Sequence, residues 1–185
     1  MTEGIAEFLI RPARESDLDV ITGFEIDIAR ASFGDEAIED AALHRKRVAA
    51  ALGKPGEVTL VAVAVTGDGE GGLGGQAGGG GEGAPVGWAW LSGRTNSLTG
   101  ARYGNFRSLA TADVPGRGTL GELLMAAVVR AATEAGHTHL TGKTHARNLG
   151  MRALYRKFGF EATHLTMEWR PGTLAAGEGG GKTAR

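Results

Sequence analysis

Glycines cluster where an extended part of the sequence gives way to a helical one. The run Pro115–Gly121 reads PGRGTLG, and apolar residues at helical spacing follow it as far as Gly136. The start of a helix leaves backbone N–H groups unpaired, and glycines let a ligand approach them closely. Arg117 adds a positive charge. The run therefore predicts a site for a phosphate or pyrophosphate, with a glycine-rich turn that binds nothing as the structural alternative.

A second segment carries a phenol on a predicted helix. Apolar residues recur at i, i+3, i+4 and i+7 from Met151 to Phe158, and Tyr155 lies on this apolar face. A phenol has a pKa of about 10 and can serve as a proton donor in a reaction. The structural alternative is a core tyrosine whose hydroxyl is satisfied by hydrogen bonds.

Together the two segments resemble the GCN5-related N-acetyltransferase family, over about Phe8 to Trp169. The family pattern N-x-x-(A)-x-x-L-Y-x-x-x-G-F fits the second segment, with Met151 where alanine is usual. The matching residues are Asn148, Leu154, Tyr155, Gly159 and Phe160. The family's loop R/Q-x-x-G-x-G/A falls on residues 116–121, with Gly116 at its first position and Thr119 at its central glycine.

The resemblance implies acyl transfer from acetyl-CoA, as co-substrate, to an amine acceptor. In the family the loop amides hold the pyrophosphate, an edge of the preceding strand pairs with the pantetheine arm, and an asparagine bonds to that arm. The residues implied as acetyl-CoA contacts are Leu109, Ala110, Thr111, Gly116, Arg117, Gly118, Thr119, Leu120, Gly121 and Asn148. The resemblance also implies that Tyr155 protonates the leaving thiolate.

The acid–base chemistry of such a transfer has two costs. A phenol and a thiol of pKa about 8.5 differ by about 1.5 units, which makes the proton transfer about 2 kcal/mol unfavourable in water, and a dry site can remove this cost. An amine of pKa about 10 is neutral in about one part per thousand at pH 7, so a base is wanted. The segment Ala101–Ala112 holds no acid. The residues that qualify as a base by type alone are Glu25, Asp27, Asp113 and His145.

The order of predicted elements is β α α β β β α β α β, an α/β fold. Strands are expected over about 5–11, 58–66, 86–92, 101–112, 137–143 and 160–169, and helices over about 16–31, 36–52, 120–136 and 151–158. Ser16 and Asp19 resemble a capping box at the first helix. Trp88 and Trp90 share one strand face, where packing in the core is favoured over lining an acceptor pocket. The resemblance implies a mixed, mostly antiparallel central sheet flanked by helices.

Glycine makes up 32 of the 185 residues, and its distribution predicts how the chain is divided. Residues 67–85 hold 11 glycines and residues 171–185 hold 5. Both stretches lack the apolar residues that would offset the entropy of ordering them. We expect one domain over residues 1–170, with a flexible hairpin insert at 67–85 that folding does not require, and a flexible tail at 171–185.

Composition argues against several other classes of protein. The chain has no cysteine, and His137 and His139 have no third ligand at suitable spacing, so no metal site is expected. A net charge of -1 offers no field for nucleic acid or anionic lipid. The basic run His44–Arg47 is interpreted as a solvated helix face. Without an apolar span or a targeting signal, a cytoplasmic protein is expected, and a homodimer is possible.

A second hypothesis stays open beside the enzyme. The departures at Gly116 and Thr119, together with the missing strand acid, favour a non-catalytic acyl-CoA-binding or regulatory domain on the same fold. Tyr155 and Asn148 favour the enzyme. The acceptor, a small-molecule amine or an exposed amine of a protein, is not specified by either segment.

Overall fold

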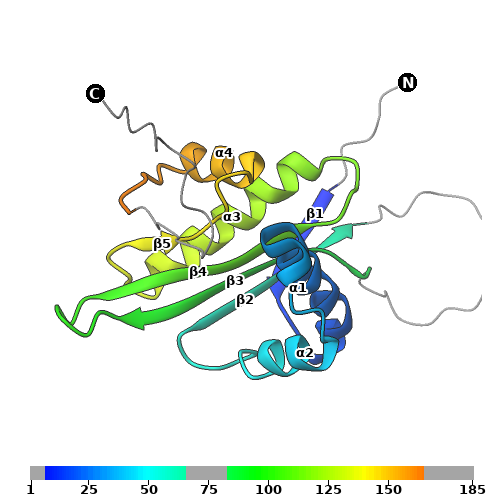
Figure 1. Cartoon of the computed structure of the whole chain (residues 1–185), viewed down its shortest axis with the longest axis horizontal. Helices are drawn as coiled ribbons and strands as arrows, with labels where there is room; N and C mark the ends of the chain where they lie inside the picture. Colours follow the sequence, from blue (N-terminus) through cyan, green and yellow to red (C-terminus); the bar gives the residue numbers. More distant parts are fainter. Residues whose placement is uncertain (1–6, 66–82, 165–185) are drawn as a thin grey trace, which may run out of the picture.

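The computed structural model describes residues 7–65 and 83–164, which form one five-stranded sheet with helices on both faces (Figure 1). The sheet order is β1-β2-β3-β4-β5; the first four strands are antiparallel, and the fifth runs parallel to the fourth. The strands are β1 (Glu7–Pro12), β2 (Glu57–Val65), β3 (Pro85–Thr95), β4 (Arg102–Thr111) and β5 (Leu140–Gly142). The predicted mixed, mostly antiparallel sheet is confirmed.

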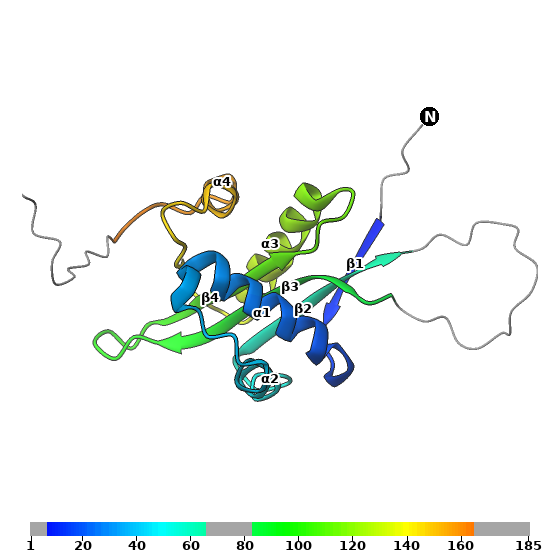
Figure 2. The ribbon, with the colours of Figure 1, turned by 45° about the vertical axis from the view of Figure 1, so that its right-hand side comes forward.

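Four helices cover the sheet, two on each face. They are α1 (Leu18–Phe33), α2 (Ala41–Ala49), α3 (Arg117–Glu134) and α4 (Leu149–Lys157), with 3-10 turns at Glu15–Asp17 and Gly34–Glu36. Helices α1 and α2 lie on one face, and α3 and α4 on the other (Figures 1 and 2). Helix α3 connects the parallel strands β4 and β5, because two parallel neighbours need a crossover rather than a tight turn.

Each face of the sheet has its own apolar core. Beneath α3 and α4, side chains such as Leu91, Phe106 and Leu124 form the larger cluster. Beneath α1 and α2, Trp88 and Trp90 are 0% and 5% exposed and pack with the second cluster. The prediction that both tryptophans share a face and belong to the core is confirmed, since alternate residues of a strand point to the same side.

Three predicted helix features are corrected by local hydrogen bonds. Helix α2 starts five residues later than predicted, because the Asp40 carboxylate accepts the N–H groups of Ala42 and Leu43 at 2.9 and 3.2 Å. Ser16 does not cap α1, since it lies inside the 3-10 turn that precedes the helix. His44 is buried rather than solvated, with its Nε2 2.7 Å from the carbonyl oxygen of Ile38.

The end of the sheet also differs from prediction. Strand β5 is shorter than the predicted 137–143, so both His137 and His139 precede it. Residues 160–164 form no strand, and the rest of the predicted last strand lies outside the described residues. The tail at 171–185 also lies outside the described residues. So does the insert at 67–85, except for its last three residues, of which Gly83 and Ala84 have no regular structure and Pro85 begins β3.

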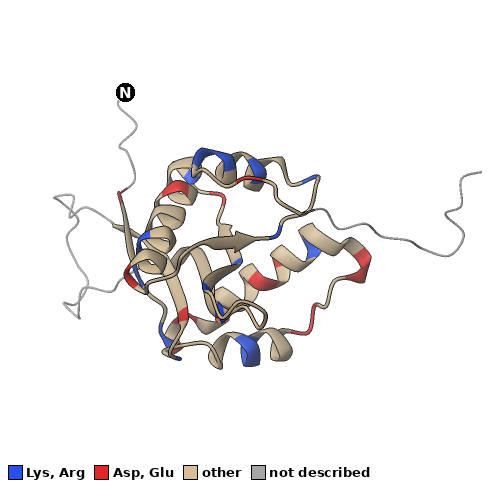
Figure 3. Ribbon diagram, turned by 90° about the vertical axis from the view of Figure 1, so that its left-hand side faces the viewer, with Lys and Arg blue, Asp and Glu red and all other residues tan. Residues whose placement is uncertain are grey.

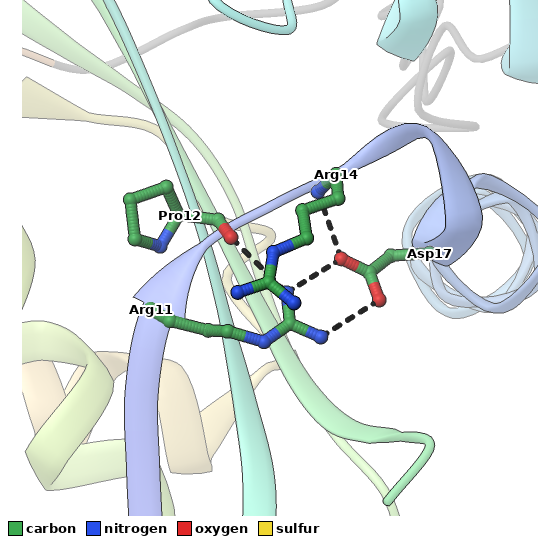
Figure 4. Close-up of polar contacts among 4 residues, drawn as sticks. All are labelled: Arg11, Pro12, Arg14 and Asp17. Carbon is green, nitrogen blue, oxygen red and sulfur yellow. Dashed lines mark hydrogen bonds and ion pairs between the residues drawn. The ribbon is translucent and has the colours of Figure 1, made fainter. Parts of the chain in front are cut away.

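A buried ion pair joins the end of β1 to the start of α1 (Figure 4). Two guanidinium N–H groups of Arg11 donate to the Asp17 carboxylate at 2.8 and 3.0 Å, and the backbone N–H of Arg14 donates to it at 2.8 Å. The Asp17 side chain is 4% exposed. The hydrogen bond from Arg11 lowers the pKa of Asp17 below its ordinary value. The pair therefore fixes where the chain turns from the sheet into its first helix.

We expect Asp17→Asn to lower the free energy of unfolding by about 3 kcal/mol, the usual cost of removing one member of a buried pair. Because the pKa of Asp17 is lowered on folding, its stabilising effect is complete above about pH 4 and is lost as the pH falls through the lowered pKa. Urea unfolding at pH 7 and pH 3 measures both effects. Asp19→Asn is the control, because the Asp19 side chain is 90% exposed in its pair with Arg45. Equal losses in the two variants would contradict the prediction.

Candidate active site

Strands β4 and β5 part at a bulge in β4. Leu91 pairs with Phe106 and Trp90 pairs with Ser108, so Arg107 is an extra residue on β4. The parallel ladder with β5 ends at the same place, since Phe106 opposite Gly142 is its last pair. A bulge bends its strand away from the neighbour and ends pairing. Beyond Phe106, the outer edge of β4 therefore has no strand beside it in the described part of the chain.

The open edge of β4 presents backbone groups to whatever lies beside it. The N–H of Ala112 donates to the carbonyl of Val86 on β3 at 2.8 Å. Backbone direction alternates along an antiparallel strand, so Ala110 also faces β3, whereas Leu109 and Thr111 face the open edge. These residues can accept an added strand or the amide groups of an extended ligand.

The glycine-rich run after β4 is mostly helical, which corrects the prediction of a loop over residues 116–121. Only Gly116 lies in the turn, with φ of 80°, a conformation that favours glycine. Helix α3 begins at Arg117, and Leu120 already donates its N–H to the carbonyl of Gly116. The N–H groups of Gly118 and Thr119 thus belong to the first turn, where a helix leaves donors unpaired.

One of the two departures from the family loop, Thr119, is accommodated by this helical start. Thr119 lies in the first helical turn, so the position does not need glycine. Gly118 faces open space, since a Cβ there would have no atom within 4 Å. The Nε of Arg117 donates to the hydroxyl of Thr111 at 3.1 Å and ties the helix start to the end of β4.

Helix α4 forms the opposite wall. Its N-cap is Asn148, whose side-chain oxygen accepts the N–H of Met151 at 2.9 Å. The sequence prediction missed this capping role, which leaves the Asn148 amide group available as a donor. Helix α4 carries three basic residues and no acidic one. These residues are Arg152, Arg156 and Lys157. The basic stretches of α4 are blue in the helix at the top of Figure 3.

A cleft of about 500 Å³ lies between the open edge of β4, the start of α3 and α4. Seven predicted coenzyme contacts line it: Leu109, Ala110, Thr111, Arg117, Gly118, Gly121 and Asn148. Gly116, Thr119 and Leu120 do not, and the Leu120 side chain is fully buried in the core. The lining residues that the sequence prediction missed are Glu122, Gly150, Met151, Ala153, Leu154 and Lys157. Those on α4 follow helical spacing, which is the signal that would have found them.

Tyr155 lies at the point where β4 and β5 part. A Cβ on Gly142 would overlap the Tyr155 hydroxyl oxygen, so the phenol fits there only because β5 has glycine at that position. The ring packs edge-on against Phe106 and is 9% exposed. Burial raises the pKa of Tyr155 to about 12. The hydroxyl is therefore protonated at neutral pH. It lies beside the last residue pair between β4 and β5, although Tyr155 does not line the cleft itself.

The four candidate bases lie in different places, and none lines the cleft. Glu25 lies on the buried face of α1 and accepts the indole N–H of Trp88 at 2.8 Å. Asp27 and Asp113 have exposed side chains near Arg30 and Arg117. His145 is exposed, and its Nδ1 accepts the backbone N–H of Arg147.

Two features are absent from the described residues. No helix among them is long and apolar enough to cross a membrane. Within residues 7–65 and 83–164, no three acidic, histidine or cysteine side chains lie close enough together to hold a metal ion.

Comparisons with known proteins find similarity in structure but not in sequence. No protein-family model and no curated protein sequence matches the chain. An aminoglycoside N-acetyltransferase, AAC(6')-Iy in complex with CoA, superposes with a TM-score of 0.64 at 19% identity, covering 92% of this chain and 98% of the other. The aminoglycoside 6'-N-acetyltransferase AAC(6')-Ih from Acinetobacter baumannii gives a TM-score of 0.61 at 14% identity, over 89% and 97% of the two chains.

A third neighbour has a different description. A transcriptional regulator from Bacillus halodurans superposes with a TM-score of 0.63 at 17% identity, over 89% of this chain and 99% of the other. At such identities a superposition establishes the fold, and a fold is shared by proteins of different function. The chain has the fold of the GCN5-related N-acetyltransferases.

Proposed function

We propose that this protein transfers an acetyl group from acetyl-CoA to a primary amine of a small molecule or a protein. The observation that carries the proposal is the convergence of three features in one cleft. These are an unpaired strand edge, the unpaired donors of a helix start and a basic second helix. An extended, amide-containing chain that ends in phosphates matches all three.

Each wall of the cleft has a separate role in holding acetyl-CoA. The N–H group of Gly118, which lines the cleft in the first turn of α3, would bind the pyrophosphate, aided by the adjacent N–H of Thr119 and the positive end of the helix. Leu109 and Thr111 would pair with the pantetheine amides. The free amide of Asn148 would donate to the same arm from the opposite wall.

Tyr155 would then protonate the leaving thiolate. The pantetheine arm, lying along the open edge of β4, leads toward Gly142, where β5 ends, and the Tyr155 hydroxyl lies there. A phenol of pKa about 12 is a weaker acid than a free thiol by about 3.5 units, or about 5 kcal/mol. The burial that raises the phenol pKa also makes a thiolate at the same place more basic, so the two shifts offset each other.

The pH dependence of the reaction should follow from the protonated phenol. A proton donor is active below its own pKa, and the pKa of Tyr155 is raised to about 12. The rate should therefore rise with pH as the amine becomes neutral, and should show no descending limb near pH 10, where an ordinary tyrosine ionises. Initial rates between pH 7 and pH 10.5 measure this. A fall with a midpoint near pH 10 would assign an unshifted group to the proton-donor role.

Two measurements test the proposal against its rival, an acyl-CoA-binding domain without catalysis. Isothermal calorimetry should show saturable binding of acetyl-CoA, and a thiol assay with a broad panel of amines should show release of free CoA. Binding without turnover on any amine would favour the binding domain. The supporting observation for that domain is that none of the four candidate bases lines the cleft, and that the acidic lining residue Glu122 pairs with Lys157. No binding of acetyl-CoA would overturn both functions.

A further inference from the structure

An exposed arginine stands where β4 and β5 part. Arg107 is the extra residue of the β4 bulge and the first β4 residue beyond the last pair with β5. Its guanidinium carbon lies 5.0 Å from the centre of the Trp90 ring. Trp90 belongs to the apolar cluster beneath α1 and α2, so Arg107 lies on that face of the sheet.

The proposed proton donor approaches the same point from the other face. The Tyr155 hydroxyl lies against Gly142, the last β5 residue paired with β4, and the Tyr155 ring belongs to the cluster beneath α3. A thioester held beside Tyr155 would be enclosed on that side by α3, α4 and their core. The acceptor amine would therefore reach the thioester from the opposite face of the sheet. The entrance on that face is next to the bulge, whose exposed side chain is Arg107.

Arg107 brings a positive charge to this entrance. Within the described part of the chain, Arg107 forms no ion pair with a carboxylate. The two acids that contact the tryptophans of this face, both among the described residues, accept hydrogen bonds from the indole N–H groups and form no ion pair with Arg107. Glu25 accepts the Trp88 indole at 2.8 Å, and Glu57 accepts the Trp90 indole at 2.7 Å.

We propose that Arg107 determines acceptor specificity by binding a carboxylate carried by the amine substrate. This rests on the proposed acetyl transfer and adds the substrate class, an amine with an acidic group of the amino-acid kind. A guanidinium binds a carboxylate through paired, charge-assisted hydrogen bonds, and the Trp90 ring holds the guanidinium in place. A polycationic amine would meet a like charge at the same entrance.

The test compares amines that differ only in that charge. The probes are β-alanine with β-alaninamide, and 4-aminobutyrate with 4-aminobutanamide. For each pair the ratio of kcat/KM, acid over amide, is measured for the wild type and for Arg107→Gln. Dividing one ratio by the other cancels the intrinsic difference in amine basicity. We expect the wild-type ratio to exceed that of Arg107→Gln by about tenfold or more, the usual effect of a charge-assisted hydrogen bond.

Two further variants and one binding measurement complete the test. Arg107→Glu should reverse the preference toward the amides. Arg130→Gln removes the same charge from the exposed surface of α3 and should keep the wild-type ratio. Arg107→Gln should bind acetyl-CoA with unchanged affinity, and a loss of that affinity would overturn the assignment to the acceptor side.

The remaining outcomes separate this inference from the proposed function. If both the wild type and Arg107→Gln turn over with equal acid-over-amide ratios of kcat/KM, the proposed role of Arg107 is wrong. The proposed acetyl transfer would be unaffected by that result. Binding of acetyl-CoA without turnover on any amine would overturn acetyl transfer and this inference with it.

Discussion

Tyr155→Phe is expected to lower kcat by about a hundredfold to ten-thousandfold, the range for removing a positioned proton donor. The substitution removes only the hydroxyl. The ring keeps its contacts with Phe106 and Phe160, whose centroids lie 6.0 and 4.8 Å away. The affinity for acetyl-CoA should be unchanged, because Tyr155 does not line the cleft. Steady-state kinetics and calorimetry on the same preparation measure the two quantities.

The stability of this variant distinguishes a catalytic tyrosine from a packing one. The Tyr155 hydroxyl forms no hydrogen bond with another of the described residues, so its removal should change the free energy of unfolding by less than about 1 kcal/mol. Tyr103→Phe is the control, because it removes the hydroxyl of the only other tyrosine, which stacks on His139. If Tyr155→Phe turns over at the wild-type rate, Tyr155 is a packing residue of the core and not the proton donor.

Gly118→Glu is expected to weaken acetyl-CoA binding by at least about a hundredfold while leaving the fold intact. The new side chain would project into the cleft, because a Cβ at Gly118 has no neighbour within 4 Å. Its carboxylate would stand where the pyrophosphate is proposed to bind, and two such charges about 4 Å apart repel strongly in a partly dry site. An acidic residue in the first turn also favours the helix, so the melting temperature should be equal or higher.

The chain offers a matched control for this substitution. Gly23 is another exposed helical glycine with open space at its Cβ, and it lies on α1, on the opposite face of the sheet. Gly23→Glu should therefore bind acetyl-CoA with wild-type affinity. Gly118→Ala should also retain most of the affinity, since it adds a methyl group without charge. Tight binding of acetyl-CoA by Gly118→Glu would place the pyrophosphate elsewhere.

Local patterns in the sequence predicted the parts of the site that depend on neighbouring residues. The apolar spacing from Met151 to Phe158 placed Tyr155 on the inward face of a helix, and the structure confirms that it is buried. The glycine-rich run predicted a helix start, and α3 begins there, although three residues earlier than expected. Asp40 shows the limit of periodicity, because a single capping carboxylate moved the start of α2.

The sequence by itself therefore determined the kinds and order of the elements as far as α4, and the two segments that line the cleft. Only the tertiary structure decided where they meet. The bulge at Arg107, the end of the β5 ladder at Gly142 and the open edge at Leu109 all depend on which residues pair across strands. Such pairings join residues far apart in the sequence, and a one-residue shift in register would turn every side chain to the other face. That is why no local pattern in the sequence singles out Arg107, although the structure places it at the entrance of the proposed acceptor site.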